Sequence, residues 1–298
     1  METSGTVFLI RRVNYTVLAF YEKINPMPTV PVVSVIIVSW NVADLLDGCL
    51  KSIRLTKYPA LEVIVVDNAS SDRSLKILSQ KSFRNLNIKI IKNSINLGFP
   101  KAVNQGLDIA GGEYILLLNP DCLLSSDFFN SGIRFFNEYP DAALLGPEFL
   151  NPDGTAQGSV FPEPSVINTL REFWFGNKNL TAKYIPYGDQ PVKVNAVSGA
   201  CMLFPRTTLA LVGRLTEKIF MYYEDLDFCR RIRRAGWFIY FHPGIQITHE
   251  HGASSRQSPL ALKYLWQSSL WYNGLVKHYL IFLISYSGQK FRKLHNIM

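Results

Sequence analysis

The chain has 298 residues, 48% of them hydrophobic, and a formal net charge of +8. This length suits one large domain with extensions, and the absence of internal repeats and low-complexity tracts excludes a repeat protein. The four cysteines are far apart and form no C-x-x-C pair, which argues against a zinc site or a disulfide framework and favours a reducing, cytoplasmic setting.

Residues 1–31 form an apolar and basic N-terminal extension. Arg11 and Arg12 interrupt its apolar stretch, and no small-residue cleavage site follows. The extension is therefore not expected to be a secretory signal peptide.

Apolar runs typical of buried strands alternate with helical patterns up to residue 119. Strands are expected at residues 32–40, 61–67, 88–91 and 114–119, and helices at 45–53, after Ser70 or Ser71, and at 99–110. This alternation predicts an α/β fold with a doubly wound, mostly parallel sheet.

Polar residues follow each of the four strands, at the edge where folds of this class bind ligands. They are Trp40 and Asn41, Asp67, Asn96, and the Asn119-Pro120-Asp121 turn. No dinucleotide-binding or P-loop glycine motif is present, so a bound phosphate would need another counter-charge. Asp121 can supply one by holding Mg²⁺ or Mn²⁺, although an Asx-type turn explains this motif alone equally well. Asp67 can bind a base or ribose, or cap a turn.

Three acids precede four arginines in residues 221–237. In a helix that begins near Glu224, Asp227 lies beside Arg230 and Arg231, which is routine surface electrostatics. Asp225 instead lies at the N-terminal end of the helix face that also contains residues 228, 229 and 232. It therefore either caps the helix or points into a site, where it could take a proton from a hydroxyl group.

His249 ends a strand expected at residues 245–248. A neutral imidazole is a good ligand for a transition metal, but a histidine at a strand end more often has a structural role. His251 is its direct competitor as a ligand.

Beyond Glu250 the chain has no acid, and it carries six lysines and arginines among many aromatic residues. Its longest apolar run is far shorter than the about 20 residues that cross a bilayer. A helix there would align along one face Trp271, Leu275, Tyr279, Phe282 and Tyr286. Residues 255–298 are expected to be a basic, amphipathic helical tail on a membrane surface, with packing on the chain's own domain as the alternative. The apolar residues argue against a nucleic-acid partner.

Taken in order, the motifs resemble those of the inverting family-two glycosyltransferases, above all their bacterial rhamnosyltransferase-like branch. The matching segments include "VSVIIVSWN", "VIVVDNASSD", "NLGFPKAVNQG", "GEYILLLNPDC", "VSGACMLFPR", "MYYEDLDFCRRIRRAGW" and "HEHGASS". The resemblance implies a single-domain GT-A fold over residues 32–254, which agrees with the alternation of strands and helices.

The resemblance also implies a role for single residues on the donor side. The nucleotide base and ribose would be held by Trp40, Asn41 and Asp67. The loop that lines the nucleotide and diphosphate would contain Asn96 and Lys101.

Other positions are implied to carry the metal and the chemistry. Asn119 and Asp121 stand at the D-x-D position, with Asp121 as a ligand of Mg²⁺ or Mn²⁺. That position reads Asn-Pro-Asp and lacks one carboxylate, so metal binding is expected to lean on His249, which fits an H-x-x-G-x-S pattern better than His251 does. Asp225 would be the catalytic base, and Glu224 would lie on the acceptor side.

The expected reaction is one inverting displacement from a nucleotide-diphosphate sugar, with dTDP-rhamnose favoured by the resemblance. The acceptor would be a saccharide or lipid-linked saccharide hydroxyl in cell-surface polysaccharide synthesis, on the inner face of the cell membrane. One alternative is a metal-dependent nucleotidyltransferase. Another is a non-catalytic descendant that binds nucleotide or membrane, against which the presence of both Asp121 and Asp225 argues.

Overall fold

The computed structural model describes residues 30–83, 85–250 and 259–294. Residues 1–29 of the N-terminal extension and His251 lie outside the described residues. The strands are β1 (Val33–Ser39), β2 (Leu61–Asp67), β3 (Ile88–Lys92), β4 (Tyr114–Leu118), β5 (Cys122–Leu124), β6 (Ala142–Leu150), β7 (Ala156–Gln157), β8 (Val160–Phe161), β9 (Val192–Val194), β10 (Ala196–Val197), β11 (Cys201–Pro205) and β12 (Phe238–His249). The helices are α2 (Ala43–Leu55), α3 (Ser74–Leu78), η1 (Lys81–Phe83), α4 (Phe99–Ile109), α5 (Phe128–Glu138), α6 (Val166–Phe175), α7 (Thr207–Val212), α8 (Glu224–Arg234), α9 (Pro259–Asn273) and α10 (Leu275–Leu294).

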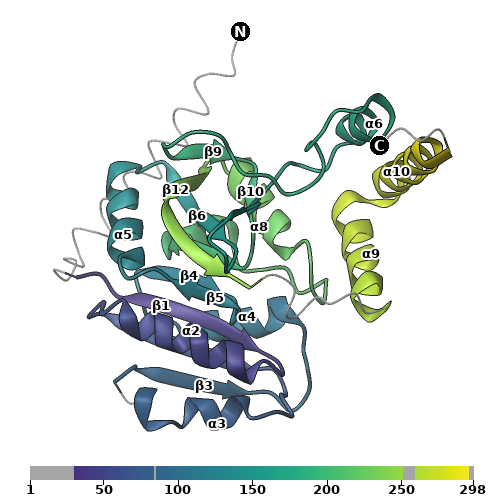
Figure 1. Ribbon diagram of the computed structural model, residues 1–298. Coiled ribbons are helices and arrows are strands. Elements are labelled where there is room, and N and C mark those ends of the chain that lie inside the picture. Colours follow the sequence, from purple (N-terminus) through teal and green to yellow (C-terminus); the bar gives the residue numbers. More distant parts are fainter. Residues whose placement is uncertain (1–29, 84, 251–258, 295–298) are drawn as a thin grey trace.

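One mixed sheet forms the centre of the molecule, with the main strand order β3-β2-β1-β4-β11-β6-β12-β5 (Figure 1). β3, β2, β1 and β4 run parallel, and β11 is antiparallel to both of its neighbours, β4 and β6. In the register of β1 and β2, Ser39 lies opposite Asp67, so both strands end at the same edge. The predicted doubly wound, mostly parallel sheet is thereby confirmed.

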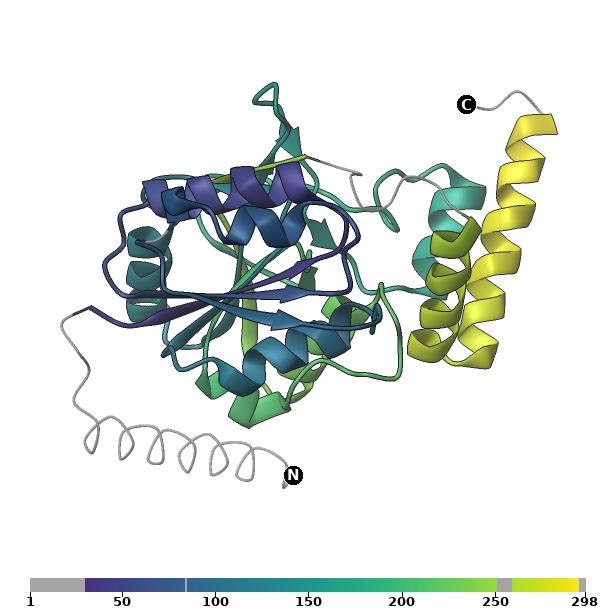
Figure 2. The same cartoon turned by 90° about the horizontal axis from the view of Figure 1, so that it is seen from below.

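Helices cover both faces of the sheet, as Figure 2 shows edge-on. α2, α3 and α5 pack with Val33, Val35 and Ile37 of β1 on one face. α4 and α8 pack with Ile36 of β1 on the other. Burial on both faces explains why β1 reads as a continuous apolar run rather than an alternating one.

The start of the helix after β2 differs from the prediction, and the first turn of α4 contains a proline. The helix after β2 begins at Ser74, and Asp72 rather than Ser70 or Ser71 accepts a hydrogen bond from its first amide (2.9 Å). Pro100 lies in the first turn of α4. Proline suits that position because the amide it lacks would have no partner within the helix.

The C-terminal helices and α6 form a separate helical lobe beside the sheet (Figures 1 and 2). α10 packs on α6, where Trp174 stacks on Phe291 at 5.4 Å between ring centroids. α9 packs on the segment before α8, where Tyr264 stacks on Phe220 and Ser268 donates a hydrogen bond to the Met221 carbonyl (2.8 Å). The lobe is therefore anchored next to the start of α8.

The expected C-terminal helical extension is confirmed, but it consists of two helices because Gly274, with a φ of 73°, separates α9 from α10. Trp271 lies on α9, and the other four residues of the expected face lie on α10. All five are at least partly exposed, with Leu275 65% and Tyr286 56% exposed, although Tyr279 and Phe282 also contact the Trp266 ring. Within the described residues, no helix combines the length and apolar content needed to span a bilayer.

Candidate active site

The carboxyl edge of the sheet gathers most of the polar residues singled out in the sequence. The ends of β1, β2 and β4, the loop after β3, the end of β12 and the start of α8 all lie there. Trp40 is 50% exposed at the end of β1. Lys101 is exposed on the first turn of α4.

Asn41 and Asp67 are held by the turn that follows β2. The Asn41 amide donates to Ser70 Oγ (3.0 Å), and its side-chain oxygen accepts from the Ser71 amide (2.7 Å). Asp67 Oδ2 accepts from the Ser70 amide (3.1 Å), while its buried Oδ1 has no hydrogen-bond partner among the described residues. An unpaired buried oxygen is costly unless a ligand satisfies it.

Asn96 organises the loop between β3 and α4. Its side-chain oxygen accepts hydrogen bonds from Asn68 Nδ2 (2.8 Å) and the Gly98 amide (3.0 Å). Gly98 has a φ of 85°, and a Cβ atom there would lie 2.5 Å from the Phe220 carbonyl oxygen. The loop is thus packed closely against the segment that leads into α8.

Asp121 and His249 face each other in a buried cluster. His249 Nε2 lies 3.7 Å from Asp121 Oδ1, and that oxygen has no hydrogen-bond partner in the described part of the chain. Gln157 Oε1 lies 2.6 Å from His249 Nδ1, and the Gln157 amide nitrogen donates to Asn151 Oδ1 (2.8 Å), so the oxygen of Gln157 faces the ring. This contact places the proton on Nδ1 and turns Nε2 towards Asp121.

This donor set fits a divalent metal of the Mg²⁺ or Mn²⁺ class. Asp121, Cys122 and His249 offer ligand atoms within 4.8 Å of one another. Burial raises the pKa of Cys122 well above its ordinary value, and its thiol donates to the Ala200 carbonyl (3.4 Å). Cys122 is therefore a packed thiol, and the carboxylate and the imidazole are the two residues that could hold the ion. Burial also raises the pKa of Asp121 to about 6, which a bound cation would reverse.

Asp225 occupies the first turn of α8 and points at the turn formed by residues 198–200. Its Oδ2 accepts from the Gly199 amide (3.0 Å) and its Oδ1 from the Leu226 amide (2.8 Å). A Cβ atom at Gly199 would lie 3.3 Å from Asp225 Cβ, so a glycine permits this close approach. The same turn contacts the Asp121 segment, because the Asn119 amide donates to the Ala200 carbonyl (2.8 Å).

The neighbouring Glu224 has a different environment. It is 9% exposed, and its Oε2 has no hydrogen-bond partner among the residues described. Burial raises the pKa of Glu224 to about 8, and the Asp225 carboxylate adds to the rise. Burial raises the pKa of Asp225 as well, but the Gly199 amide and Lys183 hold that rise back. Of the two acids, Asp225 is the better placed to be ionised at neutral pH.

No sequence pattern marks Lys183, yet it lies within electrostatic range of both Asp121 and Asp225. Its ammonium group donates to Ser198 Oγ (3.2 Å) and lies 4.8 Å from the centroid of the Phe161 ring. Burial lowers the pKa of Lys183, and Asp225 and Asp121 oppose the change. Lys183 thus places one positive charge within electrostatic range of both acids.

The arginines of α8 differ in part from the sequence-based expectation. Arg231 Nε binds Asp227 Oδ2 (2.9 Å), as expected for this spacing. Arg230 does not pair with Asp227 but binds Glu163 Oε1 (2.9 Å), in the loop after β8. The residues expected on the face led by Asp225, namely Phe228, Cys229 and Ile232, are fully buried.

The fold is similar to that of solved glycosyltransferases. A mannosyltransferase from Pyrobaculum calidifontis, solved with GDP-mannose and Mn²⁺, matches with a TM-score of 0.58 and 16% identity over 96% of this chain and 86% of its own. The S. aureus protein TarS, residues 1–349 with UDP-GlcNAc, matches with a TM-score of 0.54 and 18% identity over 84% of this chain and 69% of its own. The architecture is thus the GT-A fold of glycosyltransferases.

Sequence comparison gives the family. Residues 34–191 match glycosyl transferase family 2, and the chain belongs to that family. An N-acetylglucosaminyl-diphospho-decaprenol L-rhamnosyltransferase of Mycobacterium tuberculosis is 28% identical over 247 residues, which cover 76% of this chain and 79% of the relative. A poly(ribitol-phosphate) beta-glucosyltransferase of Bacillus spizizenii is 34% identical over 156 residues, which cover 50% of this chain and 24% of the relative.

Proposed function

We propose that this glycosyltransferase moves a sugar, with inversion, from a nucleotide-diphosphate sugar to a hydroxyl group of a lipid-linked saccharide. The observation that carries the proposal is the pair of facing sites, Asp121 with His249 and Asp225 with Gly199, joined by the turn at residues 198–200. The first suits a metal–diphosphate and the second suits an acceptor hydroxyl.

The donor is proposed to lie along the carboxyl edge of the sheet. Trp40, Asn41 and Asp67 would bind the base and ribose, and the unpaired Asp67 Oδ1 is available to a ribose hydroxyl. The diphosphate would lie near Asn96, Lys101, Asn119 and Asp121. A divalent ion held by Asp121 and His249 would neutralise the charge of the leaving nucleoside diphosphate.

The residue that accepts the proton in the proposed displacement, Asp225, lies on α8. Asp225 takes the proton of the acceptor hydroxyl as that oxygen forms a bond to the anomeric carbon. The bond from this carbon to the diphosphate breaks on the opposite side, and the electron pair leaves with the nucleotide. Lys183 keeps Asp225 ionised before the step, while Glu224 contributes to the acceptor side of the site as a neutral acid.

The acceptor and the cellular location are proposed from the helical lobe and the relatives. The rhamnosyltransferase of Mycobacterium tuberculosis is named for a lipid diphosphate acceptor, and this favours dTDP-rhamnose and a lipid-linked saccharide here. α9 and α10 expose large apolar side chains beside lysines and arginines, which suits peripheral binding to an anionic membrane surface. The cytoplasmic face is where nucleotide sugars would be available.

The proposal is tested by a transfer screen of nucleotide sugars with Mn²⁺, Mg²⁺ or EDTA, using wild type and Asp225→Asn. One donor should stabilise both proteins in a metal-dependent way, and only wild type should turn it over. A folded protein that responds to no nucleotide sugar and no free nucleotide would refute the proposal.

A further inference from the structure

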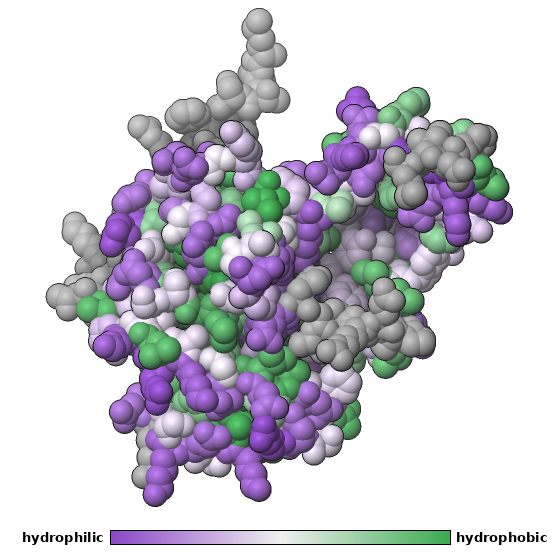
Figure 3. All heavy atoms as spheres, viewed as in Figure 1, coloured by the Kyte–Doolittle hydropathy of each residue, from purple (hydrophilic) through white to green (hydrophobic). Residues whose placement is uncertain are grey.

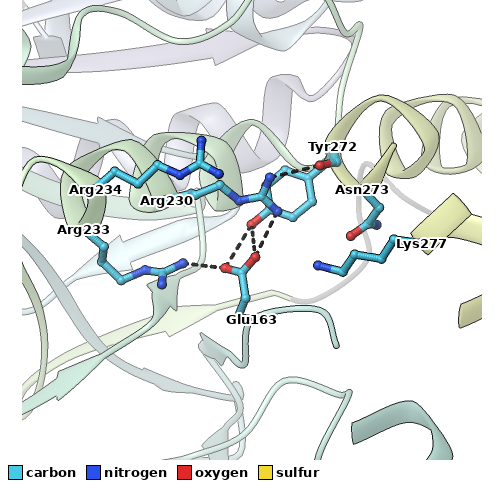
Figure 4. A pocket seen from close by; sticks show the side chains of 7 residues that line it. All are labelled: Glu163, Arg230, Arg233, Arg234, Tyr272, Asn273 and Lys277. Atoms are coloured by element: carbon cyan, nitrogen blue, oxygen red, sulfur yellow. Dashed lines mark hydrogen bonds and ion pairs between the residues drawn. The ribbon is translucent and has the colours of Figure 1, made fainter. Parts of the chain in front are cut away.

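A basic pocket of about 380 Å³ lies between α8, the loop after β8 and the junction of α9 with α10. It is lined by Glu163, Arg230, Arg233, Arg234, Tyr272, Asn273 and Lys277 (Figure 4). Four cationic side chains surround one carboxylate, which leaves an excess of three positive charges. In Figure 3 the surface is hollowed between the sheet domain and the helical lobe, where this junction lies.

Part of the pocket is a rigid frame that joins α8 to α9. Glu163 binds Arg230 at 2.9 Å and also binds Arg233, and Tyr272 OH donates to both Glu163 oxygens (3.1 and 3.2 Å). The Arg230 guanidinium lies 3.3 Å from the centroid of the Tyr272 ring and donates to the Tyr272 carbonyl (3.0 Å). Such stacking and paired hydrogen bonds hold the arginines in place before any ligand arrives.

Two cations of the pocket, Arg234 and Lys277, lie outside the Glu163 frame. Among the described residues, no carboxylate forms an ion pair with Arg234 or Lys277, and the buried Nε of Arg233 has no hydrogen-bond partner. Burial lowers the pKa of Lys277, and Glu163 opposes the change. Arg234 is exposed and Lys277 is half-buried, so both cations can donate to an anion with several oxygen atoms that enters the pocket.

The position of the pocket relates it to the proposed acceptor site. Arg230 and Arg234 follow Asp225 on α8 by five and nine residues, which corresponds to about 8 Å and about 14 Å along the helix axis. The nine-residue spacing places Arg234 on the side of α8 opposite Asp225, so Arg230 is the arginine of the pocket that lies nearer to Asp225 along the helix. α10 begins with Leu275 and Val276, which directly precede Lys277 and are 65% and 71% exposed. The pocket therefore lies farther along α8 than Asp225 and borders the exposed apolar start of α10.

We propose that this pocket binds the diphosphate of a lipid-linked saccharide acceptor and so sets the distance between the lipid and the reacting hydroxyl at Asp225. The inference rests on the proposed transfer to such an acceptor and assigns the place of its phosphoryl groups. A phosphoryl group is also present in anionic phospholipid headgroups, and the experiment separates these two sources.

The first test is a binding measurement that needs no turnover. Farnesyl diphosphate is titrated by calorimetry, in EDTA, into the full chain and into a double variant with Arg234→Ala and Lys277→Ala. Neither side chain takes part in the Glu163 frame, so the fold should be kept. The control double variant has Lys290→Ala and Lys293→Ala, which remove two exposed cations of α10 outside the pocket. We expect at least tenfold weaker binding in the pocket variant only, with a difference that shrinks at high salt.

Two further measurements separate the outcomes. The KM for an N-acetylglucosaminyl-diphospho-lipid should rise at least tenfold in the pocket variant, while the KM for a neutral octyl glycoside of the same sugar stays unchanged. Equal affinity of wild type and the pocket variant for farnesyl diphosphate, or no binding by wild type, would overturn the inference. So would a pocket variant that loses only its binding to phosphatidylglycerol vesicles, which would make the pocket a headgroup site. If farnesyl diphosphate binds as expected but no nucleotide sugar is turned over, the proposed function fails and the phosphate pocket stands.

Discussion

Replacing Glu224 with Gln tests which of the two adjacent acids is ionised. The pKa of Glu224 is raised from its ordinary value near 4.5 to about 8 because the side chain is buried next to Asp225. The folded state therefore favours protonated Glu224, and wild type loses stability from this group as the pH rises between these two values. Glutamine carries no such proton, so the variant is expected to gain stability relative to wild type over the same interval.

The size of this gain in stability follows from the linkage between proton binding and folding. One proton contributes at most about 1.4 kcal/mol per pH unit, which gives an upper limit of about 2.7 kcal/mol between about pH 6 and pH 8. Because Asp225 shares the titration, we expect about 1–2 kcal/mol. Urea unfolding at both pH values measures it, with the exposed Glu138→Gln as the matched control. A Glu224→Gln difference that is the same at both pH values would refute the assignment of Glu224 as the protonated acid.

Three further changes test the site. Asp225→Asn should lower kcat about 10²- to 10⁴-fold while calorimetry still detects donor binding, since only the general base is lost; a rate within threefold of wild type would exclude that role. Gln157→Leu should weaken Mn²⁺ binding about 10- to 100-fold, because His249 loses the acceptor that orients its ring; unchanged metal affinity would count against His249 as a ligand. Lys183→Met should move the acidic limb of kcat/KM to higher pH by about 1–3 units, because the Asp225 carboxylate loses a nearby cation; an unmoved profile would show that Lys183 acts only in packing.

The sheet and its ligand-binding edge could be predicted because both depend on local patterns. Continuous apolar runs such as Val33–Ser39 predict strands buried on both faces, and the register of β1 with β2 brings Ser39 and Asp67 together at one edge. Asp225 could be separated from Asp227 because the helical period places Phe228 and Ile232 below it, in the core.

Contacts between distant segments could not be predicted in the same way. Lys183 follows a stretch without periodicity, and the bridge between Val160 and Tyr184 helps to bring it to the site. Gln157 reaches His249 from β7, 92 positions earlier in the chain. Arg230 satisfied the spacing rule for a pair with Asp227, but it binds Glu163 and also stacks on Tyr272, whose carbonyl accepts a hydrogen bond from it. Helical spacing indicates which side chains can form a pair, and tertiary packing determines which pairs form.

The most direct test of inverting transfer at Asp225 is the anomeric configuration of the product. A nucleotide sugar of known configuration is incubated with the protein, a divalent metal and a lipid-diphosphate saccharide, and the new linkage is assigned by proton NMR. We expect the configuration opposite to that of the donor. Retention of configuration, or metal-dependent release of pyrophosphate in place of sugar transfer, would contradict a single displacement with Asp225 as the base.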